Sequence, residues 1–475
     1  MSEFHMPTDW LMARTEATPE ALALMFAGRS WSFGQLDSWV TKLSLRLAAE
    51  GVLPSQHIGL LAPNTPTFAC CVFALARLGA VVVPFNTRLT ATEIAWQLRQ
   101  SDCSRLLCTE LTAESAGKAA RDIPCLTIPG EADAFEKWLG DPGYSNLPGP
   151  PDEPEQAQGI VFTSGTTGYP KGAIITYANH FWSAVASAVR LGVHTDDRWL
   201  VCMPLYHIGG LAVLFRSCLY GTAVLLHDGF ETDAVLASIA SERATLLSLV
   251  PTMLERLLDA GLSDKATPAL RLVLLGGASA SSGLLTRAAE RGLPVAVTYG
   301  ATEAASQVAT MMPERAKVKP GSVGRPLMFT SVEVVDGDGH ALTDGEPGEI
   351  VVSGPTVMAG YYNQPAATTE VVSDGRLHTG DIGCFDVDGD LWILSRRTDL
   401  IISGGENIYP AEIERVLGEH PAVGQACVVG LPHPVWGQQV AALVTLKEGQ
   451  SVPDSELLAF CRQGSRATNS LVSCS

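Results

Sequence analysis

Residues 162–176 read Phe-Thr-Ser-Gly-Thr-Thr-Gly-Tyr-Pro-Lys-Gly-Ala-Ile-Ile-Thr, a short turn that follows an apolar run. Serine and threonine hydroxyls can donate hydrogen bonds to phosphate oxygens, and glycines let backbone N–H groups approach the same oxygens. No Gly-Lys-Ser/Thr opens a helix here, which argues against a Walker-type loop. The stretch predicts a polyphosphate-binding loop rather than a solvated Gly/Ser turn. The residues expected to contact phosphate are Thr163, Ser164, Gly165, Thr166, Thr167, Gly168 and Lys171.

Residues 163–172 resemble the signature of the adenylate-forming superfamily, which contains acyl-CoA synthetases, luciferases and the adenylation domains of peptide synthetases. Its members activate a carboxylate with Mg-ATP to an acyl-adenylate, release pyrophosphate and pass the acyl group to a thiol. The resemblance implies ATP, Mg²⁺ and coenzyme A as cofactors, and a small carboxylic acid as substrate.

The composition is that of an acidic globular protein. The chain has 475 residues, of which 46% are hydrophobic and 17% charged, and its formal net charge is −18. This length predicts a large body and at least one further unit, and the charge argues against a nucleic-acid partner or docking on anionic lipid. The 11 cysteines form no Cys-x-x-Cys pattern, which favours reduced thiols.

No targeting or membrane-spanning segment is recognisable. Residues 1–13 lack the continuous apolar core of a signal peptide, and the longest apolar stretch, residues 68–85, is interrupted by Arg77. We therefore expect a cytoplasmic enzyme with no membrane span. The sequence leaves the oligomeric state open, a homo-oligomer included.

Short apolar strands alternate with helical stretches through most of the chain, which predicts an α/β body of mostly parallel sheets flanked by helices. The strands are expected within residues 57–62, 80–84, 246–250 and 272–277. A helix is predicted over residues 33–50 from leucine and valine spacing, and another from Thr90, which forms a capping box with Glu93.

The sequence pattern changes at about residue 331, where segments of alternating apolar and polar residues are separated by Asp-Gly turns. This pattern predicts a small β-barrel or sheet subdomain over about residues 331–395, at the end of a large domain spanning residues 1–395. The resemblance implies a small α+β carboxy-terminal domain over residues 396–475, with a helix at about 411–419 and a strand near 426–429. This domain is expected to be incomplete, with an unusual tail over about 462–475.

The run Leu-Val-Leu-Leu-Gly-Gly at residues 272–277 is an apolar strand that ends in Gly276 and Gly277. Ligands of α/β sheets bind at the carboxyl ends of strands, and glycines would let a flat adenine lie close to the backbone. A simple strand-to-helix turn is the alternative.

Residues 297–307, Val-Thr-Tyr-Gly-Ala-Thr-Glu-Ala-Ala-Ser-Gln, match a second motif of the superfamily. The resemblance implies that Tyr299 stacks on adenine, that Thr302 contacts phosphate and that Glu303 is a ligand of Mg²⁺. A carboxylate oxygen is the ligand type this ion prefers, although an isolated Thr-Glu pair would usually begin a helix.

Asp381 lies fifteen positions before Arg396, and this spacing matches the superfamily pattern in which both residues hold the ribose. A lone aspartate in such a turn would otherwise cap backbone N–H groups. The resemblance also places the interdomain hinge at Thr398 and assigns Gly404 and Gly405 to a narrow pantetheine tunnel.

His207, in Met-Pro-Leu-Tyr-His-Ile-Gly-Gly, corresponds to a histidine that gates substrate entry in the superfamily. Capping of a loop is the structural alternative. A general base is not required, because a carboxylate is already ionised at neutral pH and attacks the α-phosphorus directly.

Residues 204–230, 302–310 and 319–327 resemble the o-succinylbenzoate:CoA ligases of menaquinone biosynthesis, although Gly209 stands where several relatives have serine. A substrate with one aromatic ring and two carboxylates needs an apolar slot and extra polar groups. The candidate polar groups are Ser306, Gln307, Thr310 and Arg216. Arg216 is either a carboxylate partner or a side chain that emerges to solvent.

The superfamily also places a lysine in a Pro-x-x-x-x-Gly-Lys segment near the carboxyl end, whereas the last lysine here is Lys447, in an apparent turn. We expect binding of ATP and acid, slow adenylation, and thioester formation from a supplied acyl-adenylate. The alternatives are a ligase for another aromatic or medium-chain acid, a nucleotide-binding relative that does not adenylate, and an adenylation domain that serves a carrier protein.

Overall fold

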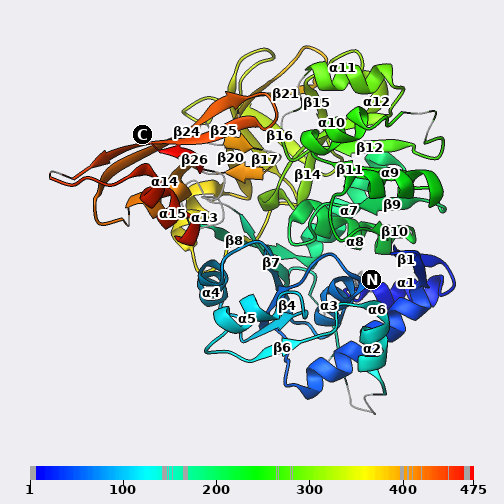
Figure 1. Cartoon of the computed structure of the whole chain (residues 1–475). Helices are drawn as coiled ribbons and strands as arrows, with labels where there is room; N and C mark the ends of the chain where they lie inside the picture. The colour runs from blue at the N-terminus through cyan, green and yellow to red at the C-terminus, as the bar shows by residue number, and fades with distance from the viewer. Residues whose placement is uncertain are drawn as a thin grey trace.

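The computed structural model describes residues 7–141, 147, 149–151, 153–163, 169–263, 265, 267–278, 280, 282–395, 401–403, 406–408, 410–418, 420–447, 449–464 and 471–474. Three sheets organise these residues, and helices pack on the sheets of the large body (Figure 1). The predicted α/β architecture, a large body followed by a smaller α+β unit, is confirmed.

The first sheet has seven strands and carries the lysine of the phosphate motif. Its order is β18 (Gly360–Tyr361), β8 (Lys171–Thr176), β7 (Ala157–Thr163), β4 (Val81–Pro84), β3 (His57–Leu61), β5 (Arg105–Cys108) and β6 (Cys125–Thr127). The strands from β7 to β6 pair in parallel, whereas β7, β8 and β18 are antiparallel neighbours.

The second sheet begins with a parallel half. Its order is β2 (Arg29–Ser32), β1 (Leu22–Phe26), β10 (Ala223–Leu226), β9 (Arg198–Val201), β11 (Leu246–Leu249), β12 (Leu272–Leu275) and β13 (Val295–Ala301). Except for the antiparallel edge strand β2, these strands pair in parallel. The strands predicted from apolar runs, β3, β4, β11 and β12, all form in the body sheets.

Beyond β13 the second sheet continues with antiparallel strands. These are β14 (Ser306–Met311), β15 (Ser322–Pro326), β21 (Leu391–Ser395), β20 (Arg376–Phe385), β17 (Gly348–Ser353) and β16 (Ser331–Val335), with β19 (Val372–Ser373) beside β20. Among the described residues β16 remains an edge strand, so of the two predicted forms the sheet is confirmed and the barrel is wrong.

An ion cluster lies where this subdomain joins the body sheet. The Lys319 ammonium, just before β15, lies 2.7 Å from Asp386, 2.5 Å from Asp388 and 2.8 Å from Asp390. These three carboxylates belong to the turn between β20 and β21. The cluster therefore fixes β21 against β15, and β15 in turn pairs with β14 of the body.

The helices of the body lie between or outside the sheets. They are α1 (Trp10–Ala17), α2 (Phe33–Ala49), α3 (Pro66–Arg77), α4 (Ala91–Gln100), α5 (Ala113–Ala119), α6 (Ala132–Leu139), α7 (Tyr177–Leu191), α8 (Ile208–Tyr220), α9 (Thr232–Ser241), α10 (Pro251–Asp259), α11 (Ser282–Glu290), α12 (Pro313–Ala316), α13 (Pro365–Val371) and the 3₁₀ turn η2 (Thr302–Ala304). The predicted helix over 33–50 and the Thr90–Glu93 capping box are confirmed by α2 and α4.

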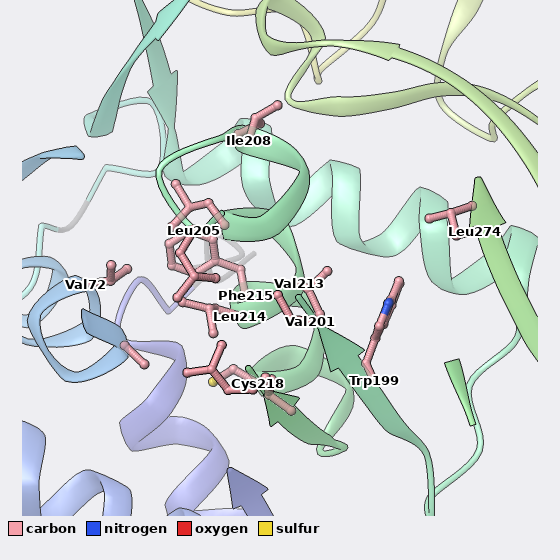
Figure 2. Packing of buried hydrophobic residues seen from close by; sticks show 14 of the residues in the cluster. Val72, Trp199, Val201, Leu205, Ile208, Val213, Leu214, Phe215, Cys218 and Leu274 are labelled. Carbon is pink, nitrogen blue, oxygen red and sulfur yellow. The ribbon is translucent and has the colours of Figure 1, made fainter. Parts of the chain in front are cut away.

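One apolar core joins the two body sheets through α3 and α8. The ring centroids of Phe73 on α3 and Phe215 on α8 lie 6.0 Å apart. Figure 2 shows Val72 of α3, Trp199 of β9 and Leu214 of α8 in this core. Nearly every position of α8 is buried, so this helix has no solvent face at its centre.

The carboxy-terminal unit has its own sheet and its own core. Its elements are β22 (Ile401–Ser403), β23 (Glu406–Ile408), α14 (Pro410–Gly418), β24 (Val423–His433), β25 (Gly437–Leu446), α15 (Asp454–Gly464) and β26 (Leu471–Cys474). The predicted helix and strand correspond to α14 and β24. Within the expected tail over 462–475, β26 pairs in parallel with β25.

The apolar stretch over residues 68–85 divides between α3 and β4. Arg77 is buried at the end of α3, where Asp9 accepts a 2.5 Å hydrogen bond from its guanidinium. None of the helices in the described part of the chain has the length and apolarity needed to cross a membrane.

Candidate functional site

Three of the expected site residues lie at the carboxyl ends of strands. Thr163 ends β7, Gly276 follows β12 and Thr302 follows β13. Such ends are where α/β sheets bind ligands. Two different sheets therefore contribute to one candidate site.

Lys171 begins β8 and is paired with Thr163 across the β7–β8 hairpin. Its side chain is buried, and its Nζ atom lies 5.1 Å from the ring centroid of Tyr361. An ammonium group above an aromatic face is attracted by the negative face of the ring. The lysine is therefore held at the end of the hairpin by Tyr361, a residue that the sequence analysis did not single out.

Glu303 lies in η2 and is half-buried. Its Oε1 atom accepts a 2.7 Å hydrogen bond from the hydroxyl of Tyr361, and its backbone carbonyl accepts one from Met358 N at 2.9 Å. In the described part of the chain, no hydrogen bond or ion pair occupies the other carboxylate oxygen, Oε2. Mg²⁺ prefers carboxylate oxygens as ligands, and the Oε2 atom of this fixed carboxylate can bind it, so Glu303 fits this ion.

The loop that carries Thr302 and Glu303 depends on Gly300. A Cβ atom at this position would lie 1.7 Å from the carbonyl oxygen of Ser306, which no side chain could tolerate. The loop then turns through Ala305 and Ser306, whose φ angles of 50° and 102° are unusual for residues other than glycine. The backbone here is strained and is held by surrounding contacts.

Tyr299 and Asp381 meet across the second sheet. The Tyr299 hydroxyl donates a 2.6 Å hydrogen bond to Asp381 Oδ2, and the tyrosine side chain is buried. Asp381 is half-buried, and its backbone N–H donates to Thr379 Oγ1 at 3.1 Å. The structure therefore brings the expected adenine and ribose residues together.

The two glycines after β12 differ in their surroundings. A Cβ atom at Gly276 would lie 2.6 Å from Thr298 Cγ2, so only glycine allows β12 and β13 to approach here. Gly277 has a φ of +78°, a left-handed conformation that favours glycine. Both features suit a narrow slot at the end of β12.

Gln307 and Thr310 lie on β14, beside Thr298. The Gln307 side-chain N–H donates to Thr310 Oγ1 at 3.0 Å, so this donor is already used within the protein. Gln307 Oε1 is buried and has no hydrogen-bond partner among the described residues. The polar group that Gln307 offers to a substrate is thus an acceptor. Ser306, at the start of β14, is half-buried.

Arg216 lies in the middle of α8 and is only 1% exposed, so the expectation that it emerges to solvent is wrong. One guanidinium nitrogen donates to Ser183 Oγ at 3.1 Å, whereas Nε has no partner in the described part of the chain. No carboxylate pairs with this guanidinium among the described residues, and burial lowers the pKa of Arg216. Within the described part of the chain, Arg216 is therefore a buried cation without a counter-ion.

His180 and Ser183 of α7 also interact with Arg216. Burial, with a smaller contribution from the Arg216 charge, lowers the pKa of His180 to about 3, so its imidazole is neutral. The Ser183 hydroxyl donates to the Ala305 carbonyl at 2.7 Å. Ser183 thus connects the buried guanidinium to the loop that carries Glu303.

His207 is the residue that precedes α8, and its side chain is exposed. Its ring centroid lies 4.6 Å from that of Tyr206. Its side chain makes no capping hydrogen bond to the N-terminus of α8.

Several expected residues lie outside the described part of the chain. These are Ser164, Gly165, Thr166, Thr167, Gly168, Arg396, Thr398, Gly404 and Gly405. Three described residues were missed by sequence reasoning, namely Tyr361, Gly300 and Ser183. Gly300 stands inside the quoted Tyr-Gly-Ala-Thr-Glu motif, whereas nothing local in the sequence connects Tyr361 or Ser183 with the site.

Two family descriptions match the chain. The AMP-binding enzyme family matches residues 11–362, and the AMP-binding enzyme C-terminal domain matches residues 412–469. Among curated proteins, a 2-succinylbenzoate--CoA ligase of Bacillus cereus is 39% identical over 455 residues, which cover 96% of this chain and 91% of the relative.

Solved structures show the same similarity. A double mutant of the o-succinylbenzoate CoA synthetase (MenE) of Bacillus subtilis, bound with its product analogue OSB-NCoA, has a TM-score of 0.90 at 36% identity, covering 97% of this chain and 93% of that one. MenE in complex with ATP and magnesium ion has a TM-score of 0.77 at 36% identity, covering 97% and 94%. The present chain is closer in overall arrangement to the first of these two structures.

Proposed function

Because the chain belongs to the AMP-binding enzyme family, we propose that it is an o-succinylbenzoate:CoA ligase that forms an acyl-adenylate from ATP and passes the acyl group to coenzyme A. Its similarity to the 2-succinylbenzoate--CoA ligase of Bacillus cereus covers nearly the whole chain, which supports the same reaction type. The buried cation on α8, described above, supports the choice of acid.

The nucleotide side of the proposed site is built from Lys171, Glu303, Tyr299 and Asp381. Asp381 would accept hydrogen bonds from the ribose hydroxyls, and its 2.6 Å hydrogen bond from Tyr299 holds it beside the proposed adenine platform. The Lys171 ammonium would neutralise phosphate charge. The substrate carboxylate is already ionised, so this reaction needs positioning and charge neutralisation more than proton transfer.

Magnesium would be held by Glu303, with its remaining ligands from phosphate oxygens and water. Held there, the ion would supply positive charge that offsets the negative charge of the phosphates met by the attacking carboxylate. Thr302, the neighbour of Glu303 in η2, would contact the phosphate from the same turn.

The choice of acid rests on the buried guanidinium of Arg216. Burying a cation is costly unless it is paired, and truncating one partner of a buried pair is strongly destabilising. An acid with a second carboxylate would supply the counter-ion that the described residues lack around Arg216. An acid with one carboxylate would leave the guanidinium unpaired, because its only carboxylate is needed at the α-phosphorus.

Other residues complete the proposal from the family resemblance. Arg396 would hold the ribose with Asp381, Thr398 would act as the hinge, and Gly404 and Gly405 would line the pantetheine tunnel. His207 would lie between the nucleotide and acyl sides, which its position at the start of α8 supports.

We also place the enzyme in the cytoplasm. Ten cysteines of the described residues are free thiols, as expected in a reducing compartment.

Parallel assays of coenzyme A thioester formation with o-succinylbenzoate, benzoate and octanoate test the proposal. We expect o-succinylbenzoate to give the highest kcat/KM, with a strict requirement for ATP and Mg²⁺. Preference for benzoate or octanoate would contradict the role of the second carboxylate while leaving the ligase class intact.

A further inference from the structure

The segment over residues 355–362 joins the two halves of the proposed nucleotide site. The Asn179 side-chain N–H₂ on α7 donates to the carbonyls of Pro355 and Val357, both at 2.9 Å. Strand β18 then pairs with β8, the strand that begins with Lys171, and Met358 N bonds to the Glu303 carbonyl. One short segment is therefore fixed to both sheets.

Tyr361, at the end of this segment, has little conformational freedom. Its side chain is buried, and its backbone N–H donates to Thr368 Oγ1 at 2.8 Å. The preceding Gly360 has a φ of +142°, and a Cβ atom there would lie 2.8 Å from Thr368 Cγ2. These contacts set the direction in which the tyrosine ring points.

The Tyr361 side chain contacts a positive charge with its ring face and a negative charge with its hydroxyl group. Its face lies 5.1 Å from Lys171 Nζ, and its hydroxyl lies 2.7 Å from Glu303 Oε1. The ring therefore stands between an ammonium and a carboxylate, which attract each other. A direct ion pair between them would weaken both charges toward a metal–phosphate ligand.

We propose that Tyr361 is a positioning residue that keeps Lys171 and Glu303 apart and orients Glu303 Oε2 toward the magnesium ion of Mg-ATP. The inference rests on the proposed function, since it assumes that this site binds ATP. The cation–aromatic contact retains the full positive charge of Lys171 for phosphate. The hydroxyl fixes the carboxylate, as outer partners of metal ligands do, and losing such partners typically costs 10–100-fold in metal affinity.

Calorimetric titration of ATP, with and without Mg²⁺, tests this role without requiring turnover. For Tyr361→Phe we expect unchanged ATP affinity without Mg²⁺ and a 10–100-fold higher Mg²⁺ concentration for half-maximal enhancement of ATP binding. For Tyr361→Leu, which also removes the ring, we expect weaker ATP binding under both conditions.

The neighbouring tyrosine provides a matched control. The Tyr362 hydroxyl donates to Asp102 Oδ2 at 3.0 Å, away from Lys171 and Glu303. Tyr362→Phe removes the same atom and should leave the Mg²⁺ dependence unchanged. The proposal is overturned if Tyr361→Phe matches the wild type, or if Tyr362→Phe shows the same loss.

The same titration separates the proposed ligase function from the proposed role of Tyr361. A wild-type chain that binds Mg-ATP but forms no thioester would refute the ligase and leave the role of Tyr361 testable by its variants. A wild-type chain that binds no ATP at all would overturn both.

Discussion

The two ends of the loop over residues 302–306 are built in opposite ways. At one end Glu303 accepts a hydrogen bond from Tyr361, and the ring of the same tyrosine contacts Lys171. At the other end the Ala305 carbonyl is joined through Ser183 to Arg216, whose Nε has no partner among the described residues. Among the described residues, the charged groups of the proposed nucleotide side are held by one another, whereas the proposed acyl side keeps a buried donor without a partner.

This difference indicates what each side is built to bind. A connected set of charges is organised before the ligand arrives, which suits a phosphate site where catalysis depends on positioning. A buried cation with an unused donor is costly until a ligand supplies the missing charge. We therefore expect the acyl side to discriminate strongly between acids, and the nucleotide side to determine the rate.

Replacing Glu303 should have the largest effect. Glu303→Gln keeps the shape and a hydrogen-bond acceptor for Tyr361 but removes the charge for Mg²⁺. We expect kcat to fall about 10²–10³-fold, as for the loss of one preorganised charge or donor at other sites. Steady-state thioester assays over a range of Mg²⁺ concentrations provide the check, and an unchanged kcat would remove Glu303 from the metal site.

Replacing Arg216 should weaken use of the acid without changing nucleotide binding. We expect Arg216→Met to lower kcat/KM for o-succinylbenzoate about 10²-fold, because a desolvated carboxylate would lose its counter-ion. ATP affinity should not change.

The same Arg216→Met variant should be as stable as the wild type in urea, or more stable, because the buried cation has an unpaired nitrogen and no carboxylate partner among the described residues. A large loss of stability would instead indicate a structural role for Arg216.

Removing the Ser183 hydroxyl tests the connection between the two sides. Ser183→Ala deletes one hydrogen bond to Arg216 and one to the Ala305 carbonyl. Each is worth about 1 kcal/mol, so we expect up to roughly a 30-fold loss of kcat/KM with o-succinylbenzoate. Ser241→Ala on α9, which deletes a hydroxyl bonded only within its own helix, serves as the control.

The smallest effect on activity, but a clear one on stability, should come from His180. The unfolded chain takes up a proton near the ordinary histidine pKa of 6.5, whereas the pKa of the buried imidazole is about 3. The unfolded state therefore binds more protons between these values. This group makes the free energy of unfolding fall as pH decreases below 6.5, by up to about 1.4 kcal/mol per pH unit.

Urea denaturation at several pH values measures this dependence. His180→Gln should flatten the slope, whereas the same change at the exposed His194 should not. Equal slopes for wild type and His180→Gln would show that another group titrates.

Sequence reasoning could propose the nucleotide side because its candidate residues occupy short motifs. Residues 163–172 and 297–307 each carry several functional groups in a fixed order, so resemblance transfers them together. Tyr361 was missed because its partners, Lys171 and Glu303, are distant in sequence and meet it only through sheet pairing. No local pattern contains that contact.

The predictions for Arg216 and for the barrel show two other limits of reasoning from sequence. A charged residue in an apolar helix can emerge to solvent or be buried, and only the packing of α8 on all sides decides between them. Asp-Gly turns predicted the strands after residue 331 correctly, but turns do not specify partners. The pairing of β21 with β15, fixed by Lys319, leaves that sheet open.

ATP–pyrophosphate exchange with o-succinylbenzoate and with benzoate is the most direct test of the account. The ratio of the two rates is decisive, whatever the absolute speed of adenylation. We predict Mg²⁺-dependent exchange that is at least about 10²-fold more efficient with o-succinylbenzoate, with the preference lost in Arg216→Met. Equal exchange with both acids, or an undiminished preference in Arg216→Met, would contradict the claim that the buried cation selects a second carboxylate.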